Sequence, residues 1–220
     1  MADDTAGTRT RWVSTERDAF VATLRAADPD APTLDEGWDV RRLVAHLVQR
    51  EHSPAGMVGD VVSRRPPGDE PGLSRLTGRA RSAQGYTALV DRFAAGAPRW
   101  SPFSWAAEQT NLLEYVIHHE DVRRAGPAGA GPRSLPGAQQ DAVWRQLGLF
   151  ALSLRSAPVG VELARPQGQA RRARKRPSVT VTGEPVELAL WISGRRGVAE
   201  VELTGDPAAV AQLERWAADR

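Results

Sequence analysis

The chemistry-bearing residues of this 220-residue chain gather in two short segments, which hold all four of its histidines. His46 and His52 belong to RRLVAHLVQREH, and His118 and His119 belong to NLLEYVIHHEDVRRA. Imidazole and carboxylate groups are the usual nitrogen and oxygen ligands of zinc. Because Glu114 and His118 are four residues apart, they would share one face of a helix. The pattern predicts a divalent metal site, first of all for zinc, made by His46, Glu114 and His118.

Three protein ligands leave one coordination position open, which is typical of a reactive zinc site rather than a structural one. Such a site would also accept nickel, cobalt or iron. Because binding requires neutral imidazoles, metal affinity should weaken below roughly pH 6. A simpler interpretation stays open, since a lone histidine is more often a structural residue than a ligand. His52 and His119 could join or replace the three ligands, although His119 would point about 100° away from His118 on a helix.

Other carboxylates lie close to the predicted ligands in the sequence. Glu120 and Asp121 could orient the ligands from behind, or they could be solvated charges that pair with Arg123 and Arg124. A metal-bound hydroxide would also permit hydrolysis, but the HExxH motif is absent and the available general bases are Glu51 and Asp121. The residues alone therefore leave the catalytic groups unassigned.

The elements that must position these residues are helices separated by Pro- and Gly-rich breaks. Apolar residues recur at helical spacing, and Asp39 is a natural N-cap for the segment that carries His46. Ser53-Pro54 would end or kink that helix. The stretches 64–72 and 125–137 read as a loop and a flexible connector. The expected helices cover residues 12–27, 40–53, 73–95, 108–124 and 138–154.

After Pro158 the pattern changes to short alternating strands and two further helices. Strands are expected at 159–163, 178–182 and 198–204, and helices at 184–193 and after Asp206-Pro207. The sequence predicts a mainly α protein, with a helical bundle at 1–157 and a small α/β domain at 158–220. The basic run QGQARRARKR at 167–176 is expected to be a mobile loop between strands, and a phosphate- or nucleic-acid-binding arm is the other interpretation.

Composition limits the partners. Lys and Arg number 29 against 27 for Asp and Glu, so the formal net charge of +2 gives no support to a nucleic-acid partner. There is no cysteine, which excludes a disulfide framework and thiolate ligands. No apolar run approaches the ~18 residues of a membrane span, and the polar first ten residues lack a signal-peptide core. A cytoplasmic protein without membrane or nucleic-acid partners is expected.

Two motifs resemble a known family. EGWDVRRLVAHLVQRE (36–51) and NLLEYVIHHEDVRRA (111–125) are similar to the mycothiol-dependent maleylpyruvate isomerase family, an actinobacterial branch of the DinB-like metal-binding four-helix bundles. An uncharacterised subfamily shares the HHEDVRRA ending. The resemblance runs through most of residues 10–125, and residues 178–213 look like the sterol-carrier-like α/β tail of these proteins. It implies an up-down bundle whose metal ligands match His46, Glu114 and His118.

The resemblance also implies a cofactor. In this family the open metal position meets a low-molecular-weight thiol, so mycothiol or a similar thiol is the expected partner, together with a small-molecule substrate. Gln49, Arg50 and Asn111, which neighbour the ligands in sequence, could hydrogen-bond the polar part of that thiol. Many relatives carry a cysteine where this chain has Asp35, so whatever that cysteine does is done differently here or not at all.

The expected function is thus a metal-dependent enzyme in which a bound thiol attacks an electrophilic small molecule, with transfer to the thiol or isomerisation as the outcome. No motif singles out maleylpyruvate as the substrate. The alternative is a non-enzymatic metal-binding protein with a regulatory or ligand-binding role, since a fold does not by itself imply a function.

Overall fold

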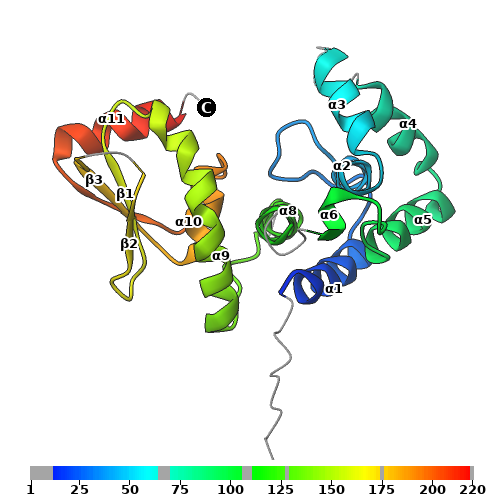
Figure 1. The fold of residues 1–220 in the computed structure, drawn as a ribbon, viewed down its shortest axis with the longest axis horizontal. Helices are drawn as coiled ribbons and strands as arrows, with labels where there is room; N and C mark the ends of the chain where they lie inside the picture. Colours follow the sequence, from blue (N-terminus) through cyan, green and yellow to red (C-terminus); the bar gives the residue numbers. More distant parts are fainter. Residues whose placement is uncertain (1–11, 64–69, 106–110, 127–128, 174–175, 219–220) are drawn as a thin grey trace, which may run out of the picture.

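The computed structural model describes residues 12–63, 70–105, 111–126, 129–173 and 176–218. A helical part and a smaller α/β part lie side by side (Figure 1). The helical part contains α1 (Trp12–Ala26), α2 (Val40–His52), α3 (Pro54–Ser63), α4 (Pro71–Arg79), α5 (Ala83–Ala94), α6 (Pro102–Trp105) and α8 (Leu112–Arg124). This arrangement confirms the predicted helical bundle followed by a small α/β unit.

The helices that carry the predicted ligands form for local reasons. Asp39 caps α2, because its carboxylate accepts a hydrogen bond from the Arg42 backbone N–H at 2.7 Å. The apolar stripes of α2 and α8 are buried, and α1 packs along α8. Within the described residues, no helix combines the length and the apolar character needed to cross a bilayer. The fully buried aliphatic residues of α2 include Leu43, Val44, Ala45 and Leu47, and those of α8 include Leu112 and Val116.

One expected helix differs in the structure. The segment 73–95 is not one helix, because α4 ends at Arg79 and α5 starts after Ser82. The Ser82 hydroxyl accepts a hydrogen bond from the Gly85 backbone N–H at 3.1 Å, so this residue caps a new helix instead of continuing the old one. The start expected at residue 108 lies outside the described residues, and α8 is described from Leu112. The break expected at Ser53-Pro54 is confirmed, since α2 ends at His52 and α3 begins at Pro54.

The α/β part is built on a four-stranded sheet with the order β2-β1-β3-β4. Its strands are β1 (Val161–Ala164), β2 (Ala170–Arg172), β3 (Val179–Thr182) and β4 (Glu202–Gly205). The two central strands, β1 and β3, are parallel, and each outer strand runs antiparallel to its neighbour. Alternate residues of β1 and β3 are buried, which gives the sheet one apolar face. Helix α10 (Pro185–Ile192) follows β3, and α11 (Pro207–Ala218) packs on β4.

The basic run at 167–176 is partly a strand, so the expectation of a simple loop is wrong for this stretch. Gly168 has a φ of +89°, which a glycine adopts without strain, and it closes a tight turn with Arg165. The chain then returns antiparallel to β1, with Ala164 opposite Ala170. The free edge of β1 thus pairs with the basic segment as β2. Residues 174–175 of the run lie outside the described residues.

Helix α9 (Gly137–Phe150), followed by a 3₁₀ segment (Ala151–Ser156), contacts both α8 and α10. A buried ion pair also crosses between the parts, since Arg124 Nη1 and Nη2 of α8 donate to the two carboxylate oxygens of Glu187 on α10 at 3.0 and 2.7 Å. Because α9 touches both sides, the domain boundary near residue 157 stays a prediction.

Candidate metal centre

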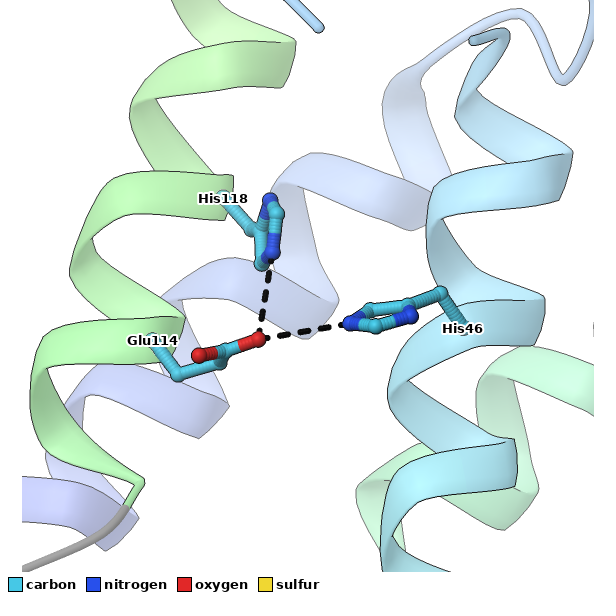
Figure 2. A group of neighbouring side chains, drawn as sticks. All are labelled: His46, Glu114 and His118. Atoms are coloured by element: carbon cyan, nitrogen blue, oxygen red, sulfur yellow. Dashed lines mark hydrogen bonds and ion pairs between the residues drawn. The ribbon is translucent and has the colours of Figure 1, made fainter. Parts of the chain in front are cut away.

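The structure brings the three predicted ligands together between α2 and α8. His46 Nε2 and His118 Nε2 each lie 3.3 Å from the same carboxylate oxygen, Oε1 of Glu114 (Figure 2). The ligand atoms of these three residues all lie within 4.8 Å of one another. The side chains of His46, His118 and Glu114 are 24%, 11% and 21% exposed, so the cluster is sheltered but still partly accessible to solvent.

This donor set fits a zinc-type ion. Tetrahedral bonds of about 2.0–2.1 Å place neighbouring donor atoms about 3.3–3.4 Å apart, and both measured nitrogen–oxygen distances match that edge. Two imidazole nitrogens and one carboxylate oxygen also form a typical set of three ligands for an ion with one open position. The fit rests on the donor types and on their spacing.

Glu114 and His118 stabilise each other's charged forms. Burial alone would raise the pKa of Glu114, but hydrogen bonds from His118 and His46, with the charges of His118 and Arg50, hold that pKa well below its usual range. Burial likewise opposes protonation of His118, and its hydrogen bonds to Asp121 and Glu114 outweigh it and raise its pKa to about 9. A metal ion at this site must therefore displace a proton from His118.

The carboxylate of Asp121 orients the ring of His118 through the nitrogen that does not face Glu114. His118 Nδ1 lies 2.8 Å from Oδ2 of Asp121, whose side chain is fully buried. A carboxylate on one ring nitrogen fixes the ring and leaves the other nitrogen to face the ligand position. Asp121 is held in turn by Arg195, which comes from the turn after α10 in the α/β part and also lies 3.2 Å from Asp35. Both parts of the chain thus build the site.

The family model for the mycothiol maleylpyruvate isomerase N-terminal domain matches residues 11–123, just over half of the chain. The chain belongs to this family. Two solved structures resemble it: the mycothiol-dependent maleylpyruvate isomerase and a variant of that protein with a histidine replaced by alanine. Each is 15% identical, covers 89% of this chain and 91% of its own, and superposes with a TM-score of 0.57, a likeness that shows the fold. A comparison with curated protein sequences gives no match.

The family match includes all three predicted ligands but ends before the α/β part. Arg195, which holds Asp121, therefore lies outside the maleylpyruvate isomerase N-terminal domain itself. Sequence reasoning missed this arginine. Its only local signal is the GRRG turn after α10, and no spacing rule connects that turn to a residue 74 positions earlier.

The residues predicted to hold a thiol cofactor separate into two places. Arg50 Nη1 donates to Oδ1 of Asn111 at 2.6 Å, and Arg50 Nε lies 3.9 Å from Oε1 of Glu114. The Arg50 guanidinium also stacks over the ring of Phe103 at 4.1 Å. These two predicted residues therefore lie beside the candidate metal centre. Gln49 instead donates to Asp60 of α3 at 2.7 Å.

The other two histidines of this maleylpyruvate isomerase family member lie outside the cluster. His119 has Nδ1 2.8 Å from Glu16 and Nε2 2.7 Å from Thr23, and its ring stacks on Phe20. Burial, as the largest cause, lowers the pKa of His119 despite the hydrogen bond to Glu16. His52 Nε2 is buried and has no hydrogen-bond partner among the described residues. The pattern HHED thus places one histidine at the candidate site and the next in the bundle core.

The two carboxylates after the histidine pair also differ in role. Asp121 contacts His118, as expected of a residue that orients a ligand. Glu120 instead accepts hydrogen bonds from Arg123, Arg124 and Arg133. Its side chain is fully buried, so it belongs to an internal ion-pair network and not to a solvated face.

Proposed function

We propose that this chain is a metal-dependent enzyme that uses a small thiol of the mycothiol type to act on an electrophilic small molecule. The reaction is transfer to the thiol or isomerisation through a reversible adduct. The observation that carries the proposal is the convergence of His46, Glu114 and His118 at the spacing of three zinc ligands. Its support is the family, whose description names both mycothiol and maleylpyruvate.

A divalent ion held by these residues supplies a Lewis-acid position at which a thiol is kept as thiolate near neutral pH. The chain has no cysteine, so the thiol has to come from a cofactor. Asp121 keeps the His118 ring turned toward the ligand position. Partial burial of the cluster limits the access of water, which strengthens the charge interactions of Glu114.

Polar groups of the cofactor are proposed to contact Gln49, Arg50 and Asn111. Arg50 has the best placed side chain, because its guanidinium lies next to Glu114 and carries a positive charge suited to a carboxylate or a hydroxyl-rich group. Asn111 fixes the Arg50 guanidinium through the 2.6 Å hydrogen bond. Gln49 would contact the cofactor only after releasing Asp60.

The first test is elemental analysis of untagged protein purified without chelator, beside His46→Ala and His118→Ala. We expect about one ion per wild-type chain and loss of the ion in both variants. His119→Gln is the matched control, since this neighbouring histidine faces the bundle core, and it should keep the ion. Wild-type protein that stays free of zinc, nickel and cobalt after reconstitution would refute the metal site.

The second test separates the possible functions. Addition of mycothiol should shift the absorption spectrum of the cobalt-substituted protein, and thiol-dependent turnover should appear on a panel of electrophiles that includes maleylpyruvate. A cobalt-loaded protein whose absorption spectrum does not change on addition of thiols would favour the non-enzymatic metal-binding alternative. Turnover of esters or amides in the absence of thiol would favour a hydrolase.

A further inference from the structure

The two histidines of the candidate metal centre are held in different ways. His118 has a buried carboxylate on its second ring nitrogen, since Nδ1 lies 2.8 Å from Asp121. The imidazole of His46 has no such partner. Within the described part of the chain it forms a hydrogen bond only through Nε2, to Glu114 (Figure 2). The orientation of the His46 ring therefore depends on contacts other than a hydrogen bond to Nδ1.

The indole ring of Trp38 packs against the imidazole of His46. The two ring centroids lie 5.2 Å apart at an interplanar angle of 67°, which is an edge-to-face contact. His118 makes a second contact of this kind with His46, at 5.6 Å and 69°. Since His118 is itself a predicted ligand, Trp38 is the one of these two neighbours that can hold the His46 ring without binding the ion.

Trp38 is fixed by the loop that enters α2. Its backbone N–H donates to the Asp35 carbonyl at 3.0 Å, and its carbonyl accepts from the Thr33 N–H at 2.9 Å. The turn from Asp35 to Trp38 has Gly37 at its third position, where a φ of +78° favours glycine. The side chain of Trp38 is partly buried against the core, and the guanidinium of Arg42 covers its ring at 5.2 Å. The indole is therefore held independently of His46.

The same loop is also tied to the second helix that carries ligands. The Leu34 N–H donates at 3.1 Å to the backbone carbonyl of Asp121, the residue on α8 that orients His118. Helix α2 begins directly after the loop, with Asp39 as its N-cap. The position of Trp38 is thus fixed relative to both α2 and α8.

We infer that Trp38 is a positioning residue of the candidate metal centre and acts through His46. The inference rests on the proposed metal-dependent function, because the orientation of a ligand matters only where an ion binds. An edge-to-face aromatic contact is attractive and restricts rotation of the imidazole. A ligand already held in its binding orientation loses less conformational freedom when the ion arrives, which strengthens binding. The indole fixes His46 as the Asp121 carboxylate fixes His118.

The test is the zinc affinity of full-length Trp38→Ala and Trp38→Phe, measured by competition with a chromophoric chelator. Trp38→Ala should bind zinc about ten-fold more weakly than wild type, because one ligand is no longer oriented. Trp38→Phe keeps an aromatic ring beside His46 and should stay within about three-fold of wild type.

Trp12→Ala is the matched control. Trp12 is also partly buried against the core and, among the described residues, its ring makes no aromatic contact with a histidine. This variant loses the same side chain at another place in the helical part, so it should bind zinc with wild-type affinity.

Two spectroscopic measurements separate positioning from a general loss of stability. The visible bands of the cobalt-substituted protein depend on ligand geometry, so they should change in Trp38→Ala and be retained in Trp38→Phe and Trp12→Ala. In metal-free protein, the proton NMR signals of the His46 ring should shift in Trp38→Ala, because the ring current of the indole is removed. The signals of His119, whose ring stacks on Phe20, should stay in place.

The outcomes distinguish this inference from the proposed function. Wild-type zinc affinity and an unchanged cobalt spectrum in Trp38→Ala would overturn the inference and leave the metal site intact. An equal loss of affinity in Trp12→Ala, or a Trp38→Phe protein that binds as weakly as Trp38→Ala, would overturn it as well. Wild-type protein that takes up no ion in the same titration would refute the metal site, and the role of Trp38 would be refuted with it.

Discussion

Arg195, in the turn after α10, donates to both carboxylate oxygens of Asp121 on α8: Nε to Oδ1 at 2.8 Å and Nη2 to Oδ2 at 2.7 Å. Asp121 also holds the ring of His118. The α/β part therefore reaches the candidate metal centre through one arginine and one carboxylate. Burial would raise the pKa of Asp121, but His118 and Arg195 outweigh it and lower that pKa, so the carboxylate stays charged and can fix both partners.

Replacing this arginine should affect both the fold and the site. In Arg195→Ala the fully buried Asp121 keeps His118 but loses its two hydrogen bonds from the guanidinium, and the free energy of unfolding should fall by about 3 kcal/mol. Because His118 is then less firmly oriented, zinc affinity should fall roughly 10- to 100-fold. Denaturant titration and a zinc competition assay measure the two effects.

Arg172→Ala is the control for this experiment, since its side chain is 72% exposed and its Nε lies 3.5 Å from Glu162 in a surface pair. It should change the unfolding free energy by less than about 0.5 kcal/mol and leave zinc affinity unaltered. An Arg195→Ala protein that binds zinc as tightly as wild type would contradict the role assigned to the arginine.

Zinc affinity should change with pH over a higher pH range than it would if His118 had the ordinary pKa of a histidine. The pKa of His118 is raised to about 9, so in the metal-free protein this residue is protonated at neutral pH. A raised pKa means that the proton competes with zinc at every pH below about 9, and affinity should drop about ten-fold per pH unit there. The sequence alone predicts that zinc affinity weakens only below roughly pH 6.

Zinc titrations in steps between pH 7 and pH 9.5 test this dependence, and buffers of different ionisation enthalpy count the protons released. Asp121→Asn is a useful comparison, because loss of the charge beside His118 should lower its pKa and move the dependence to lower pH. Affinity that stays flat from pH 9 to pH 7 would show that His118 carries no proton to displace.

The chain's two motifs predict the helical bundle and the convergence of His46, Glu114 and His118, because a capped helix and an i, i+4 pair are local features. The choice between His118 and His119 also follows from helix geometry, which turns neighbours about 100° apart. Local patterns therefore carry most of the site.

The role of Arg195 could not be predicted, because its partner Asp121 lies 74 residues earlier and only tertiary packing brings them together. The strand inside the basic run was missed for a similar reason. Three residues, Ala170 to Arg172, become a strand because the edge of β1 is free to pair, and this is a property of the sheet and not of the segment. The split of the helix expected at 73–95 depended on recognising Ser82 as a cap.

Substitution of His119 should lower stability and leave zinc bound, whereas substitution of His118 should remove the zinc. His119→Ala removes hydrogen bonds to Glu16 and Thr23 and the stack on Phe20, so we expect a loss of about 2–4 kcal/mol of stability with one zinc ion still bound. His118→Ala should lose the ion. Thermal unfolding in the presence of chelator, paired with elemental analysis, separates the effects, and loss of zinc in His119→Ala protein that remains folded would contradict the assignment.

The pair between Arg124 and Glu187 should hold the two parts together without touching the ligands. Both side chains are buried, and among the described residues Glu187→Ala leaves the guanidinium with Glu120 and the Val198 carbonyl as its partners. Removing one member of a buried pair should cost about 3 kcal/mol of unfolding free energy. Denaturant titration measures this loss, and Glu214→Ala, at an exposed position, should change stability by less than about 0.5 kcal/mol.

The zinc content of Glu187→Ala distinguishes the roles of two contacts between the helical part and the α/β part, Arg124–Glu187 and Arg195–Asp121. We expect it to stay at one ion per chain with wild-type affinity, because Glu187 contacts none of the predicted ligands. Arg195→Ala should lose stability and affinity together, since its arginine acts on His118 through Asp121. If both variants weakened zinc binding equally, the site would depend on the general docking of the α/β part and not on the specific contact made by Arg195.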